Sequence, residues 1–439
     1  MSIFKELKVF FSYPRNMRVL LTTNFIYAFV LPVLYFFISM YIMRNTSDVR
    51  LVMSFQMANY TGLLITFFFN GYLLRIIPVK YLYSAGMLIS GISMSVMISL
   101  KELDIYGIAI AGGLMGVSFG LFWANRDYLA LSSTTDENRN YYYGLENFLA
   151  TLCSLVVPIM VGWFIAGSQL YGWFGGDRNH AYFFVTIAVL CLAALASIIV
   201  CQGRFTNPAS TQFLYFRYHP LWYKVLLMEA LRGLGQGFMV TAPAMLVMKL
   251  AGGQEGSLGM IQTTGNILTA LAFYAIARLA RPQDRIWILF IGLGSYVVGT
   301  VCNAVFFNTT GLIIFMACQL LATPFIECSF TPVLMLVIDL LSKKENRNKF
   351  AYLFNNEFAL YGGRVFGGGL FIVVATYISD IAALRYTLMI VGILQFFSYF
   401  LCKQVLGACE RMDAELTEYD LRTIPHSVVE MDPLEASNR

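Results

Sequence analysis

Charged residues are scarce in this chain of 439 amino acids, because only 13% are Asp, Glu, Lys or Arg while 58% are hydrophobic. Soluble globular chains carry about 25% charged residues, so the composition argues against a water-soluble protein of this length. Aromatic residues reach 15% and methionines number 21, which also favours a chain that lies in lipid. The composition therefore predicts a protein embedded in a bilayer.

Histidine is nearly missing, with three residues, and the eight cysteines occur singly without any Cys-x-x-Cys pair. These absences argue against a disulfide framework and a histidine-lined metal path, and we expect no cofactor and no metal. A site made from the carboxylate of Glu327 and the thiol of Cys328 stays open. The sequence has no glycine loop followed by Lys and Ser or Thr, which argues against an ATP-driven pump, and we expect no enzyme activity.

Apolar runs of about 20 residues, the length that crosses a bilayer, recur along the chain. The expected helices are 17–43, 50–74, 80–100, 105–131, 143–168, 180–201, 222–250, 256–279, 286–306, 310–341, 349–379 and 383–406. The expected units are an N-terminal bundle at 1–201, a linker at 202–221, a C-terminal bundle at 222–406 and a charged tail at 407–439. The sequence thus predicts an all-α membrane protein with twelve transmembrane helices in two pseudo-symmetric six-helix bundles.

Lys and Arg are distributed unevenly over the expected loops. If the N-terminus is cytoplasmic, most of the 30 Lys and Arg fall on the cytoplasmic side or at the cytoplasmic helix ends, and Arg126, Arg232 and Arg364 are the three assigned to apolar helices rather than to either side. Because basic residues collect in cytoplasmic loops, both termini are expected in the cytoplasm of a cell with the chain in its inner membrane. The same rule explains the net charge of +5 without a nucleic-acid partner.

The two expected halves carry a repeated motif at corresponding loops. Glu137-Asn138-Arg139-Asn140 follows the fourth expected helix, and Glu345-Asn346-Arg347-Asn348 follows the tenth. Parallel repeats of this kind enclose a binding site at their interface.

With this repeat, the six-linker-six layout, the glycines of the fourth helix and the run Pro158 to Gly162, the chain resembles the major facilitator superfamily over about residues 1–406. The fourth-helix glycines are Gly112, Gly113, Gly116 and Gly120. The loop after the second helix keeps Gly71 and Arg75 but lacks the aspartate that the family carries there. The resemblance implies two six-helix bundles and transport of a solute by alternating access.

Polar side chains at membrane depth are costly unless paired or facing water, and so they indicate functional sites. Glu229, Arg232 and Gln236 share one face of their helix at i, i+3 and i+7. The predicted substrate-binding residues are Asn24, Tyr27, Trp123, Arg126, Arg232, Gln236, Gln262, Asn266 and Arg364. The arginines suit a carboxylate, phosphate or sulfate, because a guanidinium offers two parallel donors.

Proton coupling needs a buried carboxyl beside an arginine, for which Glu327 is the first candidate, with Glu229 and Glu357 behind it. The predicted gating residues are Asp127, Arg139, Glu146 and Arg347. The competing interpretation is a set of structural salt bridges, in which Arg232 pairs with Glu229, and Arg364 with Glu357 or Glu327.

These residues predict a secondary active transporter, a proton symporter, that moves a small polar anion, either an acidic sugar or another organic anion. The alternatives are an exporter of drugs or metabolites and an uncoupled facilitator. An exporter of lipophilic cations would favour an acidic cavity without central arginines, which the three helix arginines oppose. We expect a monomer whose partners are the small-molecule substrate, protons and the lipid bilayer.

Overall fold

The fold is helical throughout the residues that the computed structural model describes, among which there is no β-strand. The described residues are 10–100, 102–134, 136–207, 215, 217–252, 260, 263–272, 276, 284–347 and 349–423. The predicted substrate residue Gln262 and half of the predicted helix 256–279 lie outside them. The all-α class is therefore confirmed for the described part of the chain.

The helices of the first half follow the expected runs closely. They are α2 (Arg15–Ala28), η1 (Val33–Phe37), α3 (Ile38–Thr46), α4 (Val49–Leu73), α5 (Val79–Ser99), α6 (Ile105–Ser133), α7 (Asp136–Leu170), η2 (Trp173–Gly176) and α8 (Arg178–Cys201). Helix starts carry the expected caps, since Asp48, Asp104 and Asp177 each accept a hydrogen bond from a backbone amide of the first turn.

The helices of the second half begin after the linker. They are α9 (Pro220–Leu250), α11 (Arg285–Phe306), α12 (Thr309–Lys344), α13 (Lys349–Tyr377), α14 (Asp380–Ala382), η4 (Ala383–Thr387), α15 (Leu388–Phe396) and α16 (Ser398–Thr423). The expected boundary at 406 falls inside α16, which continues to Thr423. The helix continues because Val405, Cys409 and Met412 recur at helical spacing and are buried.

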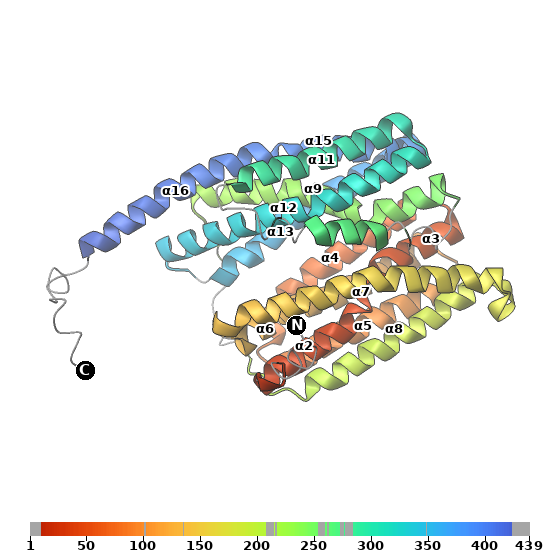
Figure 1. The fold of residues 1–439 in the computed structure, drawn as a ribbon, viewed down its shortest axis with the longest axis horizontal. Coiled ribbons are helices and arrows are strands. Elements are labelled where there is room, and N and C mark those ends of the chain that lie inside the picture. The colour runs from red at the N-terminus through yellow and green to blue at the C-terminus, as the bar shows by residue number, and fades with distance from the viewer. Residues whose placement is uncertain are drawn as a thin grey trace.

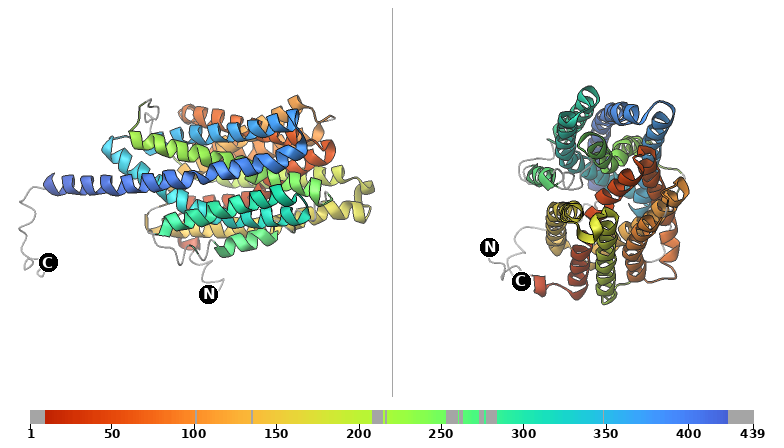
Figure 2. Two further views of the ribbon diagram at one scale, coloured as in Figure 1. Left: turned by 90° about the horizontal axis from the view of Figure 1, so that it is seen from above. Right: turned by 90° about the vertical axis from the view of Figure 1, so that its right-hand side faces the viewer.

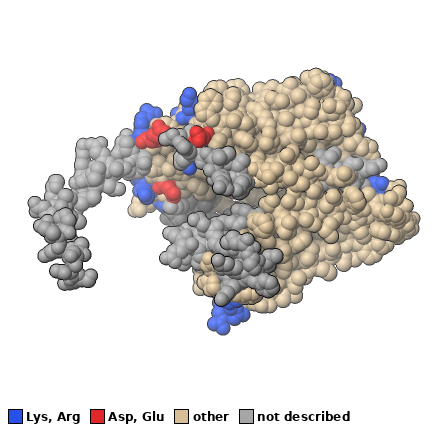
Figure 3. Space-filling view, in the orientation of Figure 1, with Lys and Arg blue, Asp and Glu red and all other residues tan. Residues whose placement is uncertain are grey.

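Ten helical stretches of the described residues are long and apolar enough to cross a membrane. The two other predicted helices are 222–250, which corresponds to α9 and carries charged and amide side chains, and 256–279. Figure 3 shows Lys, Arg, Asp and Glu at the ends of the molecule and a broad uncharged band of described residues between them. Length, composition and this band make the chain a multi-pass membrane protein.

The two halves lie side by side with their helices along the long axis of the molecule (Figures 1 and 2). Helix α4 packs along α13, and α3 packs against α9, so that both contacts join the first half to the second. Asn266 adds a third junction, because its side chain donates to the carbonyl of Ser154 in α7 at 2.6 Å. A solute that passes between the halves would contact residues at these junctions.

Glycines let the helices approach closely within each half. A Cβ on Gly116 of α6 would overlap the carbonyl of Asn59 and lie 2.7 Å from the Cα of Gly62 in α4. A Cβ on Gly363 of α13 would overlap the carbonyl of Ala230 in α9. Small residues at such crossings bring backbones together in membranes, and here they hold α4 against α6 and α9 against α13.

This packing predicts a position-specific effect of alanine in α6. We expect Gly116→Ala to lower stability by about 1–3 kcal/mol, because the new methyl group forces the two backbones apart. Gly113→Ala is the matched control, since a Cβ there meets nothing within 4 Å. Thermal unfolding of both purified variants in detergent measures the difference, and equal melting temperatures would contradict the close-packing account.

Candidate functional site

An ion cluster lies deep in the second half around Arg232. Its guanidinium donates to Glu229 Oε2 at 3.2 Å on the same helix and to Glu327 Oε2 at 2.5 Å on α12. The side chains of Arg232 and Glu229 are 11% and 0% exposed, whereas that of Glu327 is 38% exposed. The salt bridge with Glu229 predicted from the i, i+3 spacing is present, and Glu327 is the second, more accessible partner.

Glu229 is incompletely satisfied in this cluster. Its Oε1 atom is buried and has no hydrogen-bond partner. A buried carboxylate oxygen without a partner is costly, so Glu229 depends on its single contact with Arg232.

Arg364 lies where α13 meets both α9 and α4. Its Nη2 and Nε atoms donate to Gln236 Oε1 at 2.7 and 3.1 Å, and Nη1 lies 3.6 Å from Glu357 Oε2. Its guanidinium carbon lies 4.7 Å from the centre of the Tyr60 ring, which belongs to the first half. The Tyr60 hydroxyl donates to the backbone carbonyl of Gln236 at 3.4 Å. Arg364 is thus held mainly by a neutral amide and an aromatic face, with one carboxylate at longer range.

A small polar cavity of about 20 Å³ joins the two arginine environments. It is lined by Arg232, Gln236, Thr323, Ile326, Glu327 and Gln395. This volume accommodates one water molecule, and the polar lining can hydrogen-bond it. The Oε1 atom of Gln395 is buried without a hydrogen-bond partner.

The charges of this region do not balance. Among the described side chains of α9, α12 and α13 that take part, Glu229, Glu327 and Glu357 face only Arg232 and Arg364. If all five are ionised, the region carries one excess negative charge. An uncompensated charge at membrane depth is costly, so this imbalance is the main electrostatic feature of the region.

A second polar network lies within the first half around Glu146. Arg126 Nε lies 2.9 Å from Glu146 Oε1, and Arg126 Nη2 lies 2.9 Å from Oε2. Asn24 donates to Glu146 Oε1 at 2.6 Å and accepts from the Tyr83 hydroxyl at 2.5 Å. The Arg126 guanidinium carbon lies 5.1 Å from the Trp123 ring centre. This network ties α2, α5, α6 and α7 together, so four predicted residues, Asn24, Trp123, Arg126 and Glu146, lie in one place.

Two predicted substrate residues make contacts within or between the bundles. Tyr27 is completely buried, and its hydroxyl donates to Ser90 Oγ at 3.0 Å inside the first half. Asn266 bridges to Ser154 as described above. Their roles in substrate binding stay predictions.

The predicted gating residue Arg347 lies at the end of the molecule that holds the linker. Arg347 lies 3.3 Å from Glu345 and over the rings of Tyr215 and Tyr218, and it donates to the carbonyl of Arg217. The linker end therefore binds the loop between α12 and α13. Of the other predicted gating residues, Glu146 belongs to the network described above, and the side chains of Asp127 and Arg139 lie outside the described part of the structure.

Tyr60 and Gln395 are site residues that the sequence did not single out. Gln395 is an amide within an apolar helix, and the membrane-depth criterion could have found it. Tyr60 gives no such signal, because an aromatic residue in a transmembrane helix is usually ordinary packing.

The sequence contains one motif that is also typical of serine hydrolases. Gly116-Val117-Ser118-Phe119-Gly120 has the Gly-x-Ser-x-Gly spacing of hydrolase nucleophile elbows. It lies inside α6 rather than at a strand-to-helix turn, and the buried Ser118 hydroxyl donates to the carbonyl of Gly86 at 2.7 Å. Ser118 therefore serves helix packing. Among the described residues, no group of three or more His, Cys, Asp or Glu could hold a metal ion.

Membrane-spanning helices with ion pairs buried among them are typical of multi-pass transporters. Residues 20–368 match the family model of the Major Facilitator Superfamily. The chain belongs to this superfamily, as the resemblance of its motifs predicted.

Three relatives were found among known proteins. The uncharacterized protein YqgE of Bacillus subtilis strain 168 is 20% identical over 422 residues, covering 92% of this chain and 93% of that protein. The uncharacterized protein in sodM 3'region of Geobacillus stearothermophilus is 24% identical over 189 residues, covering 43% of this chain and 86% of that protein. Monocarboxylate transporter 9 of Pongo abelii is 31% identical over 145 residues, covering 32% of this chain and 26% of that protein.

The two arginines of the second half should differ in their effect on stability. We expect Arg232→Gln to destabilise the protein by about 3–5 kcal/mol, because it leaves two carboxylates without their cation, one of them completely buried. Arg364→Gln should cost clearly less, because Glu357 lies 3.6 Å away and is 24% exposed. Folded yield and the melting temperature without ligand measure both effects. Equal losses would contradict the assignment of Arg232 as the centre of the ion cluster.

Proposed function

We propose that this protein is a secondary active transporter that moves a small organic anion together with a proton by alternating access. The observation that carries the proposal is the set of three carboxylates and two arginines on α9, α12 and α13. The partial match to a monocarboxylate transporter supports a carboxylate as the anionic group. Within this class, an acidic sugar or a monocarboxylate fits the arginine and amide donors of the site.

Arg364 is the proposed anion-binding group. Its strongest partner is the neutral Gln236, and its carboxylate partner Glu357 is too distant for a hydrogen bond. A substrate carboxylate can therefore replace Glu357 and form two charge-assisted hydrogen bonds. Tyr60, from the first half, contacts the same guanidinium. An anion bound at Arg364 would therefore lie close to both halves.

Glu327 is the proposed proton-binding group. It is the most exposed carboxylate of the cluster, and it contacts both Arg232 and the hydroxyl of Thr331. Water that enters the adjoining cavity would reach it before it reaches Glu229, whose side chain is completely buried. Binding of an anion at Arg364 adds negative charge to a region that already holds three carboxylates, and in the proposed mechanism a proton accompanies the anion.

The membrane orientation completes the proposal. Lys and Arg favour cytoplasmic termini and an inner-membrane location. In that orientation the linker and Arg347 lie on the cytoplasmic side, where Arg139, Asp127 and the pair Arg126–Glu146 are the proposed gate of the first half. The proposed units are the bundles at 1–201 and 222–406, the linker at 202–221 and the tail at 407–439, although α16 continues through residue 406 to Thr423.

A ligand screen with neutral controls of matched shape tests the anion site. Lactate and glucuronate are compared with lactamide and glucuronamide for thermal stabilisation of the purified protein, since a ligand that binds only the folded state raises its melting point. For the carboxylate that stabilises best, Arg364→Lys should weaken binding about tenfold or more through loss of the paired donors, and Arg364→Gln should weaken it further. Lower stability with unchanged affinity would make Arg364 a structural residue.

A transport assay tests the coupling site. In vesicles, Glu327→Gln should abolish accumulation of that carboxylate driven by a proton gradient and leave exchange across the membrane largely intact, because the variant cannot bind and release a proton. Glu102→Gln is the control, since Glu102 is an exposed carboxylate in the loop before α6. Normal gradient-driven accumulation by Glu327→Gln would remove Glu327 from the coupling role.

A further inference from the structure

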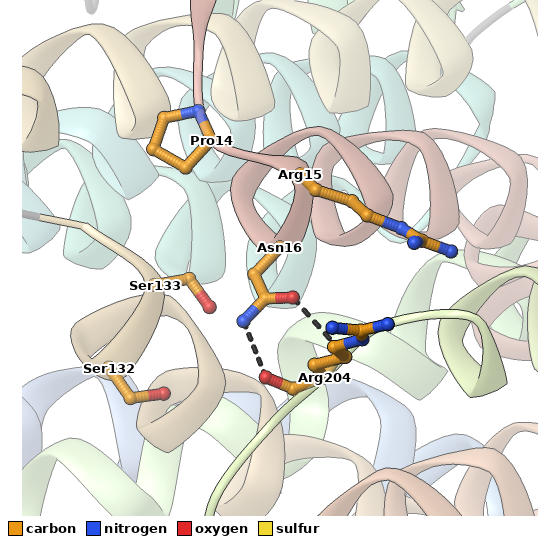
Figure 4. Close-up of a pocket in the computed structure, with 6 residues that line it drawn as sticks. All are labelled: Pro14, Arg15, Asn16, Ser132, Ser133 and Arg204. Carbon is orange, nitrogen blue, oxygen red and sulfur yellow. Dashed lines mark hydrogen bonds between the residues drawn. The ribbon is translucent and has the colours of Figure 1, made fainter.

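A pocket with a volume of about 470 Å³ lies at one end of the first bundle, far from the ion cluster in sequence and in the fold. It is lined by Pro14, Arg15, Asn16, Ser132, Ser133 and Arg204 (Figure 4). These residues come from three places that the chain brings together: the start of α2, the end of α6 and the exit from α8. The pocket is therefore made by the fold rather than by one surface loop.

Hydrogen bonds fix the wall that carries the charge. The Asn16 side chain donates to the carbonyl of Arg204 at 2.6 Å, and the Arg204 amide donates to Asn16 Oδ1 at 2.9 Å. This pair of bonds joins the first turn of α2 to the beginning of the linker. In Figure 4 the Asn16 amide lies between the two arginine side chains and the two serines.

The described lining has positive charge and no negative charge. Neither Arg15 nor Arg204 forms a salt bridge with an acidic side chain among the described residues. Two guanidinium groups at one pocket repel each other unless an anion lies between them. The lining thus favours an anionic ligand with several acceptor oxygens.

Hydrogen-bond donors of the backbone and side chains point to the same ligand. The first hydrogen bond of α2 runs from the Arg18 amide to the Pro14 carbonyl, and Pro14 provides no side-chain cap, so the amides before Arg18 have no partner within the helix. The hydroxyl oxygen of Ser133 is buried without a hydrogen-bond partner. The Ser132 hydroxyl already donates to the carbonyl of Leu129. The guanidinium groups, the free amides and the Ser133 hydroxyl are together the kinds of donor that bind phosphate.

The depth of the pocket suits the membrane surface. The spans end at Arg15, Ala130 and Cys201, so the lining residues lie at or within a few residues of the point where three helices leave the lipid. Basic pockets between helices at this level bind the headgroups of anionic lipids. We propose that the pocket binds a phosphate group, carried either by an anionic phospholipid or by a soluble phosphorylated compound.

The ligand would hold the start of α2, the end of α6 and the linker together. The pocket and the ion cluster share no residue. Ligand binding in the pocket can therefore be tested separately from transport at Arg364. The proposal can therefore fail while the proposed transport function stands, and the reverse.

The test uses the full-length protein purified in neutral detergent, with two arms. In the first, dioleoylphosphatidylglycerol is titrated against dioleoylphosphatidylcholine; in the second, inorganic pyrophosphate is titrated against chloride at equal ionic strength. Melting temperature and native mass spectrometry report stabilisation and the number of lipids bound. We expect the anionic ligand of at least one arm to stabilise the wild type, and Arg15→Gln/Arg204→Gln to raise the half-saturating concentration about tenfold or more.

The matched control is Arg75→Gln/Arg411→Gln, which removes the same charge at the same end of the molecule outside the pocket, and it should bind like the wild type. Single variants Arg15→Gln and Arg204→Gln, each expected to weaken binding, replace the double variant if it does not fold. Stabilisation by phosphatidylglycerol alone identifies a lipid headgroup, and stabilisation by pyrophosphate identifies a soluble phosphate compound. No stabilisation in either arm, or equal loss in the pocket and control variants, would overturn the proposal.

Discussion

The balance of charge around Arg232 and Arg364 is the constraint on which the second half depends. Three carboxylates share two guanidinium groups where ionised groups are expensive. Arg232 is committed to two of these carboxylates, and Arg364 is held by an amide, an aromatic ring and one distant carboxylate. The same set of charges therefore separates a strongly paired arginine from one that is free to change its partner.

Close helix packing makes this arrangement possible. Gly363 brings α13 against the carbonyl of Ala230 in α9, and the next residue, Arg364, meets Gln236 further along α9. Across the boundary between the halves, Thr61 and Tyr361 share a hydrogen bond of 3.1 Å beside the contact of Tyr60 with Arg364. A change in the position of α13 relative to α4 would thus alter the environment of Arg364 directly. In the proposed mechanism, this contact is what would couple occupation of the site to movement of the halves.

The sequence predicted most of the helices because each is a long apolar run, and it predicted the pair Glu229–Arg232 because helical spacing fixes neighbours on one helix. It could not choose the partner on another helix, and so it left Arg364 between Glu357 and Glu327, whereas Glu327 binds Arg232. Helical periodicity predicts which residues share one face of a helix, but it does not predict which helix packs against that face. Tyr60 was missed because an aromatic residue in a transmembrane helix carries no signal of its own. Asn24 and Tyr27 bond within the first half, and their substrate roles stay predictions.

The number of protons taken up with the anion tests the central claim most directly. Isothermal titration of the stabilising carboxylate in buffers with different ionisation enthalpies yields this number. Near neutral pH the charge balance predicts uptake of about one proton per anion bound, because the added negative charge must be compensated in the cluster. Glu327→Gln should bind the anion without that uptake. Binding with no linked proton in the wild type would contradict the account.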